Sequence, residues 1–183
     1  MNSFFQLIAR HRVLASTLFL AIFPFIMPYE ALAINILIFG LFAMGFNLLF
    51  GYMGLLSFGH AAFLGIGSYL TGIGIVHYGM PWGAAILVGI IGAAIGGLIM
   101  GYLAIRTRGI YFSMVTLALG QIIYYIFYKA ESLTGGENGL RGVRVDQFNI
   151  FGIPVDFLNP LIKYYIILFF VVIAIWLISR ILS

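Results

Sequence analysis

The feature that most constrains this chain is a long stretch without any charged side chain. No Asp, Glu, Lys or Arg occurs from Ala31 to Ile105, a run of 75 residues. A helix that crosses a bilayer needs about 20 mainly apolar residues, so the run has room for three such helices. Only 8% of all 183 residues are charged, against about 25% in soluble domains. The chain is therefore predicted to be an integral membrane protein, which excludes soluble enzymes, nucleic-acid binders and amphipathic surface anchors.

Charged and turn-forming residues divide the sequence into six apolar segments. Each segment is apolar all round, which favours helices, because barrel strands alternate in polarity over about ten residues. We predict an all-α, polytopic transmembrane protein with about six spans and a single membrane domain over 1–183. The segments are Val13–Met27, Ala31–Phe50, Ala61–Val76, Gly83–Ile105, Gly109–Tyr128 and Leu161–Ser179.

The first segment has a second interpretation. Basic residues, a short apolar run and the sequence Ala31-Leu32-Ala33 are also typical of a signal peptide and its cleavage site. Cleavage there would leave the apolar run 34–50 at the new terminus. This uninterrupted continuation favours an uncleaved helix.

The basic residues predict the orientation, because the cytoplasmic loops of membrane proteins carry an excess of Lys and Arg. With the N-terminus inside, every short basic loop lies on the cytoplasmic side. The segment 129–160 then becomes an ordered external loop, in which three basic residues stand against four acidic ones. The inner basic residues are Arg10, Arg12, Arg106, Arg108 and Arg180.

Glycine is concentrated in the uncharged region, where 17 of the 23 glycines lie between Gly40 and Gly109. Small residues let helix backbones approach closely in a bilayer. The segment 83–105 carries a strip of them, for which we predict tight helix packing, with a glycine-lined pore wall as the alternative. The strip consists of Gly89, Gly92, Gly96, Gly97 and Gly101.

The stretch 51–60 combines glycines with Ser57 and His60. Gly54 and Gly59 weaken helix continuity, and irregular backbone at membrane depth is tolerated only inside protein or beside water. Two interpretations stay open, a loop at the inner membrane surface and a broken helix that enters a translocation path. Nothing near His60 resembles a second metal ligand or a catalytic partner, so we expect a hydrogen-bonded structural histidine and no metal, cofactor or catalytic residue.

Polar residues also lie within the apolar segments themselves. Each of them either lines an aqueous path or bonds to a neighbouring helix, and interhelical bonding is the more common role. On segment 109–128 one helix face carries Ser113, Thr116, Gly120 and Tyr124. Our candidates for the translocation path are Asn47, Ser57, His60, Ser113, Thr116 and Gln121.

Ion-coupled carriers commonly hold an ionisable residue inside the membrane. The run from Ala31 to Ile105 has no Asp, Glu, Lys or Arg, and Glu30 lies at its edge. We therefore expect the energy for any uphill transport to come from another subunit.

Three stretches of sequence, which follow one another along the chain and which we call blocks, are more specific than the composition. The first is Asn47–Tyr69 (NLLFGYMGLLSFGHAAFLGIGSY) and the second is Arg106–Leu117 (RTRGIYFSMVTL). The third is Ser132–Leu140 (SLTGGENGL), with the loop motif Thr134, Gly135, Gly136, Asn138 and Gly139. Together the blocks resemble the permease subunits of branched-chain amino-acid ABC importers, of the LivM type.

The resemblance implies a transport subunit without an ATPase site of its own, in a bacterial or archaeal cytoplasmic (inner) membrane. It implies a second homologous permease subunit, two cytoplasmic ATPase subunits and an extracytoplasmic substrate-binding protein as partners, and no nucleic acid. Related permeases serve urea or short amides, and a passive channel for a small neutral solute is a further alternative. Members of the family continue beyond the sixth segment, so we expect this chain to be the N-terminal part of a permease.

Overall fold

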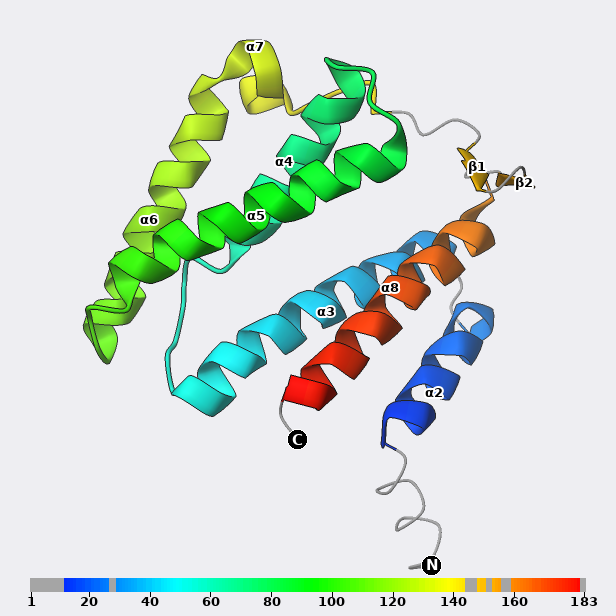
Figure 1. The fold of residues 1–183 in the computed structure, drawn as a ribbon, viewed down its shortest axis with the longest axis horizontal. Helices are drawn as coiled ribbons and strands as arrows, with labels where there is room; N and C mark the ends of the chain where they lie inside the picture. The colour runs from blue at the N-terminus through cyan, green and yellow to red at the C-terminus, as the bar shows by residue number, and fades with distance from the viewer. Residues whose placement is uncertain (1–11, 27–28, 144–147, 151–152, 156–158, 182–183) are drawn as a thin grey trace, which may run out of the picture. The chain divides into compact units, whose positions relative to one another are not determined.

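The computed structural model describes residues 12–26, 29–143, 148–150, 153–155 and 159–181. Most of them are helical (Figure 1), which confirms the predicted all-α class. The long helices are α2 (Arg12–Ile26), α3 (Glu30–Met53), α4 (Ala61–Val76), α5 (Trp82–Ala104), α6 (Ile110–Lys129) and α8 (Pro160–Ile181). The short elements are the helix α7 (Glu131–Thr134), the 3-10 helix η1 (Gly136–Asn138) and the strands β1 (Phe148–Ile150) and β2 (Ile153–Val155).

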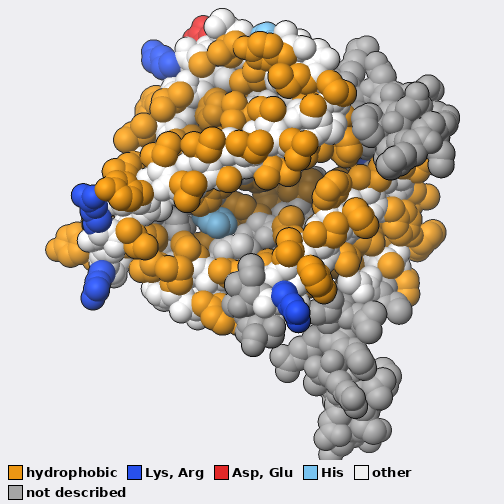
Figure 2. Space-filling model, viewed as in Figure 1, with side chains coloured by type: hydrophobic (Ala, Val, Ile, Leu, Met, Phe, Trp, Pro, Cys, Tyr) orange, Lys and Arg blue, Asp and Glu red, His pale blue; other side chains and the backbone are white. Residues whose placement is uncertain are grey.

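Among the described residues, four helices are long and apolar enough to cross a membrane, namely α3, α5, α6 and α8. The helix α4 has 16 residues and is about 24 Å long, which is short of the roughly 30 Å of a bilayer core. Hydrophobic side chains cover much of the surface seen in Figure 2, and this agrees with a protein embedded in lipid. The polytopic class is thus confirmed, whereas six spans remain a prediction.

The chain forms two compact units, one of residues Met1–Met44 with Asp146–Ser183 and one of residues Gly45–Val145. In the first unit, α8 packs against α2 and the start of α3. The hydroxyl of Tyr164 donates a hydrogen bond to the carbonyl oxygen of Leu20, at 2.6 Å. The buried core of this unit is Ala33, Leu37, Tyr164, Leu168 and Val171. A single domain over the whole chain stays a prediction.

Strands β1 and β2 pair antiparallel, with Phe148 opposite Val155 and Ile150 opposite Ile153. They lie in the segment 129–160, which was predicted as an ordered external loop. The same segment holds α7 and η1. Much of this segment therefore has local secondary structure in addition to turns.

In the second unit, α4 and α5 form a closely packed antiparallel pair, and α6 lies alongside (Figure 1). A Cβ atom on Gly89 would lie 2.6 Å from the carbonyl oxygen of Gly67 in α4. Cβ atoms on Gly92 and Gly96 would meet the side chains of Leu70 and Ile66 of α4.

The other two members of the strip are placed differently. A Cβ atom on Gly97 would be in ordinary contact with Phe63, at 3.8 Å, and no described atom lies within 4 Å of one on Gly101. The close contact is thus made by Gly89, Gly92 and Gly96, which are spaced along one face of the helix.

Candidate functional site: a groove between α4 and α6

The helical path of the chain is interrupted between Met53, where α3 ends, and Ala61, where α4 begins. Gly54 has a φ of +64°, in the left-handed region that is favourable for glycine and strained for other residues. Its amide still donates a hydrogen bond to the carbonyl oxygen of Phe50. The segment 54–60, which we call the break segment, leaves the helix at this glycine.

Two hydroxyl groups of α6 hold the break segment. The Ser113 hydroxyl donates a hydrogen bond to the carbonyl oxygen of Leu56, at 2.7 Å. The backbone N–H of Phe58 donates to the hydroxyl oxygen of Thr116, at 3.2 Å. Both hydroxyl residues are buried. Because lipid supplies no hydrogen-bonding partner, these side chains satisfy backbone groups that a helix would have satisfied itself.

The break segment crosses α6 at a pair of glycines. A Cβ atom on Gly59 would collide with the carbonyl oxygen of Thr116, and one on Gly120 would lie 3.1 Å from the Cα atom of Gly59. Gly120 follows about 15 Å of helix from Ile110, which is half of a bilayer core of roughly 30 Å. The break segment therefore runs beside the first half of a candidate span and ends near its middle.

His60 lies at the end of the break segment, between aromatic rings of two helices. Its ring makes edge contacts with Phe46 of α3, at a centroid distance of 5.8 Å, and with Phe63 of α4, at 5.4 Å. These contacts join the last part of α3 to the start of α4.

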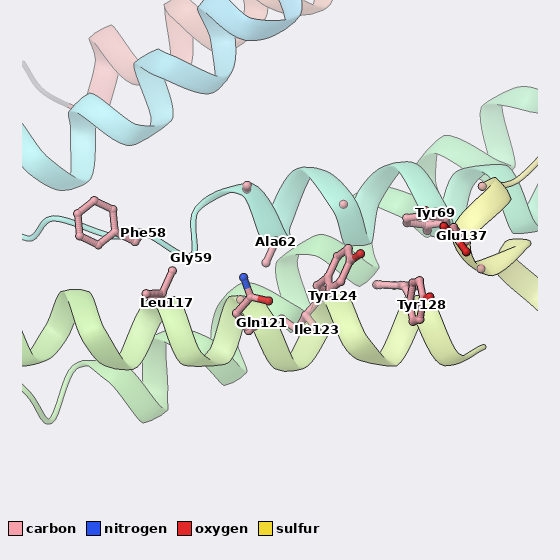
Figure 3. Close-up of a pocket in the computed structure, with 16 residues that line it drawn as sticks. Phe58, Gly59, Ala62, Tyr69, Leu117, Gln121, Ile123, Tyr124, Tyr128 and Glu137 are labelled. Atoms are coloured by element: carbon pink, nitrogen blue, oxygen red, sulfur yellow. The ribbon is translucent and has the colours of Figure 1, made fainter. Parts of the chain in front are cut away.

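Beyond the glycine crossing, α4 and α6 leave a groove of about 440 Å³ between them (Figure 3). Pockets for small ligands commonly have volumes of about 300–1,000 Å³. The described residues that line the groove are Phe58, Gly59, Ala61, Ala62, Gly65, Tyr69, Leu117, Gly120, Gln121, Ile123, Tyr124, Phe127, Tyr128, Gly136, Glu137 and Gly139. The groove thus extends from the break segment to the loop that follows α6.

The polar groups of the groove are unevenly distributed along it. Gln121, Tyr124 and Tyr128 are on α6 at spacings of three and four residues, and Figure 3 shows them between α6 and α4. Phe58 lies at the end nearest the break segment, and Glu137 lies at the opposite end. Among the described lining residues, Glu137 is the one charged side chain.

The loop that carries Glu137 is tied to both helices. The buried hydroxyl of Thr134 accepts a hydrogen bond from the N–H of Gly136 and lies 2.6 Å from the carbonyl oxygen of Phe127 in α6. A ring nitrogen of His77, after the end of α4, lies 3.0 Å from the carbonyl oxygen of Leu133. The loop is therefore an ordered wall at one end of the groove.

The backbone conformation of the loop explains the glycines of the loop motif. Gly135, Gly136 and Gly139 have φ values of +75°, +54° and +67°, which other residues adopt only with strain. A Cβ atom on Gly135 would also collide with the carbonyl oxygen of Gly139. This geometry explains why the motif needs glycine at these positions.

The structure separates the six candidate path residues. Gln121 lines the groove, while Ser57, Ser113 and Thr116 are buried at the crossing of the break segment and α6. His60 lies beside that crossing. Asn47 is exposed on α3 and is not among the lining residues.

Sequence reasoning missed Tyr69, Tyr128 and Glu137 as lining residues. The spacing of Gln121, Tyr124 and Tyr128 along one face of α6 is a signal that could have found Tyr128. Tyr69 and Glu137 have no such signal, because they reach the groove from other elements.

Comparison with known proteins identifies the family of the chain. Residues 29–180 match the family model described as "branched-chain amino acid transport system / permease component". The high-affinity branched-chain amino acid transport system permease protein LivM of Salmonella typhimurium is 31% identical over 166 residues, which cover 80% of this chain and 39% of that relative. The protein of the same name from Escherichia coli is 28% identical over 165 residues, with the same two coverages.

The chain thus spans about two fifths of the length of these relatives. No solved structure matches it. The match confirms the resemblance carried by the three sequence blocks, and with the apolar helices it indicates an integral membrane protein. The chain belongs to the family of permease components of branched-chain amino acid transport systems.

Proposed function

We propose that the chain is a permease subunit of an ABC importer that moves branched-chain amino acids inward across a bacterial or archaeal cytoplasmic membrane. The observation that carries the proposal is the family match over residues 29–180. In this assembly, two cytoplasmic ATPase subunits supply the energy, a second permease subunit completes the path and an extracytoplasmic binding protein delivers the solute. The run of 75 residues without Asp, Glu, Lys or Arg supports an energy source outside the chain.

In this proposal the groove between α4 and α6 is one wall of the outer half of the path. Its floor is the crossing of Gly59 and Gly120, near the middle of the span, and its mouth is the loop that follows α6. The amide of Gln121 and the hydroxyls of the tyrosines replace part of the water around the solute. Ser113 and Thr116 support the floor through the break segment, since both are buried and bonded to it.

The charged ends of the second unit support this direction. Arg106 and Arg108 are exposed at the turn between α5 and α6, at the end of α6 opposite to Glu137. Short loops with excess basic residues lie on the cytoplasmic side. The groove mouth then faces outward, and the N-terminus is cytoplasmic. Single cysteines at Arg108 and at Glu137 should react with impermeant reagents from opposite sides, and reaction of both from one side would refute this orientation.

An uptake assay tests the function. Cells that lack other branched-chain amino-acid importers, and that express the chain from its native gene neighbourhood, should accumulate radiolabelled leucine. Accumulation should stop when ATP is depleted or the binding protein is removed. Downhill leucine entry that persists without ATP and without the binding protein would instead establish a passive channel. Uptake of urea or a short amide in place of leucine would reassign the solute.

A further inference from the structure

We propose that the groove binds an aliphatic amino acid in one direction, with its ammonium group at Glu137 and its side chain toward the Gly59–Gly120 crossing. This inference rests on the proposed function, and it adds the recognition chemistry and the orientation of the solute. The one charged side chain among the described lining residues is a carboxylate, and no Lys or Arg is among them.

A carboxylate at the mouth distinguishes solutes by their charge. It attracts an ammonium group and repels a carboxylate, so a zwitterion is favoured when its ammonium end faces Glu137. The carboxylate of the zwitterion then remains in contact with water at the open mouth. A solute that carries only a carboxylate meets repulsion without compensation.

Aromatic rings stand at the same end of the groove. Tyr69 and Tyr128 line the groove near Glu137 (Figure 3), and the faces of aromatic rings attract cations. The Tyr69 ring is stacked on Phe127 of α6 at a centroid distance of 4.9 Å, which fixes its position between the two helices. The mouth therefore offers two kinds of attraction for an ammonium group.

The opposite end of the groove is uncharged and mainly apolar, with the amide of Gln121 beside the crossing (Figure 3). Phe58, Leu117 and the glycine crossing line it, and they offer no charged group to a solute. An aliphatic side chain gains by leaving water there. The two ends therefore favour the same orientation of an amino acid.

Glu137 is held in place by the backbone around it. The N–H of Asn138 donates to the carbonyl oxygen of Gly135, and the N–H of Gly139 donates to that of Gly136. The motif that distinguishes this loop in the sequence thus has a function beyond turn formation, because it places a carboxylate at the groove mouth.

Direct binding to the full chain in lipid nanodiscs, without binding protein and without ATP, tests this inference. The ligands are L-leucine, L-leucinamide, which keeps the ammonium group, and 4-methylpentanoate, which lacks it. Leucine and leucinamide should bind about fivefold or more tightly than 4-methylpentanoate, as the sizes of exposed ion-pair and cation–π interactions suggest. Glu137→Gln should remove that preference.

Glu131→Gln is the matched control, because Glu131 is an exposed carboxylate of the same loop that does not line the groove. It should keep the preference. Equal behaviour of the two variants, or equal binding of leucine and 4-methylpentanoate to the unsubstituted chain, would overturn the inference. So would a Glu137→Gln variant that loses uptake but keeps the preference, since Glu137 would then serve in docking the binding protein. Leucine uptake, measured separately, tests the proposed function.

Discussion

On the side of α4 that faces α5, the contact is made through glycines, and the two helices touch along three of them. On the side that faces α6, α4 and the break segment approach closely at one place, the crossing of Gly59 and Gly120. Beyond that crossing, tyrosines and a glutamine stand between the helices and the groove opens. The same short helix thus has a closed side and an open side.

The difference shows what determines where a cavity forms between the helices of a membrane protein. Lipid gives helices little hydrophobic reason to associate, so close approach depends on small residues and on hydrogen bonds. The α5 side has small residues spaced for contact throughout. The α6 side has one such contact, fixed by Ser113 and Thr116, and larger side chains elsewhere.

The largest effect is expected at the single close contact of the open side. Gly59→Ala would put a Cβ atom against the backbone carbonyl of Thr116, which cannot move away as a side chain could. We expect the unfolding free energy in detergent to fall by about 3 kcal/mol, at the upper end of typical overpacking costs. Thermal or SDS-induced loss of helical circular dichroism measures it.

Gly65→Ala is the control for this substitution. Gly65 is inside α4, and no described atom lies within 4 Å of an added Cβ atom. Alanine should therefore raise stability by up to about 1 kcal/mol through its higher helix propensity. Similar effects at Gly59 and Gly65 would show that the crossing does not restrict the open side.

A smaller effect is expected on the closed side. Gly89→Ala would bring a Cβ atom to 2.6 Å from the carbonyl oxygen of Gly67 and against the hydroxyl of Thr71. Part of the cost is relieved because Thr71 can change rotamer, so we expect a loss of about 1–2 kcal/mol. Gly101→Ala, in the same helix with no described atom within 4 Å, should be neutral or stabilising. Equal losses at both positions would argue against α4–α5 packing as the reason for the strip.

Removal of one hydroxyl should cost less again. Thr116→Val keeps the shape of the side chain but leaves the N–H of Phe58 without its acceptor, at a cost of about 1 kcal/mol. Thr71→Val is the control, because the Thr71 hydroxyl bonds to the carbonyl oxygen of Gly67 within its own helix. The same denaturation assay measures both variants. An equal loss of unfolding free energy for Thr71→Val and Thr116→Val would show that the hydrogen bond to the break segment has no special importance for stability.

Much of the fold follows from hydropathy and turn residues. The two ends of each predicted apolar segment lie within three residues of the ends of a helix in the structure. This agreement is expected, because the limits of an apolar run can be read from the local sequence. The break was also foreseeable, since Gly54 and Gly59 stand in an apolar context. Which glycines of the strip touch a neighbour was not foreseeable, because Gly89 and Gly101 look alike in sequence and differ only in what lies opposite.

The candidate site was harder to predict for the same reason. Ser113 and Thr116 are hydroxyl residues on one helix face, and their partners are backbone groups that have no signature in side-chain sequence. Glu137 was foreseeable as part of a loop motif, but its place at the groove depends on how the loop folds back onto α4 and α6. Long-range contacts of this kind are not encoded in the local pattern.

The smallest change in stability, and the sharpest test of the open side, comes from two adjacent tyrosines. Tyr124 and Tyr125 are 57% and 58% exposed, and their rings contact each other at 5.6 Å, so replacement of either by leucine removes a similar surface and this ring contact. Tyr124 also stacks on Tyr128, at a centroid distance of 5.9 Å. Only Tyr124 is among the described lining residues. Both variants should change the unfolding free energy by less than about 0.5 kcal/mol, as is usual for exposed positions.

Uptake should separate the two variants. Tyr124→Leu should lower the rate of leucine uptake by about two- to tenfold, which corresponds to one lost aromatic contact of roughly 0.5–1.5 kcal/mol. Tyr125→Leu should leave uptake near its original rate. The comparison is informative because length, charge, exposure and helix position are nearly the same, and the two residues differ in the direction of the side chain. If both variants lowered uptake equally, the face of α6 that carries Tyr125 would be as important as the groove, and α4 would have no distinct open side for the solute.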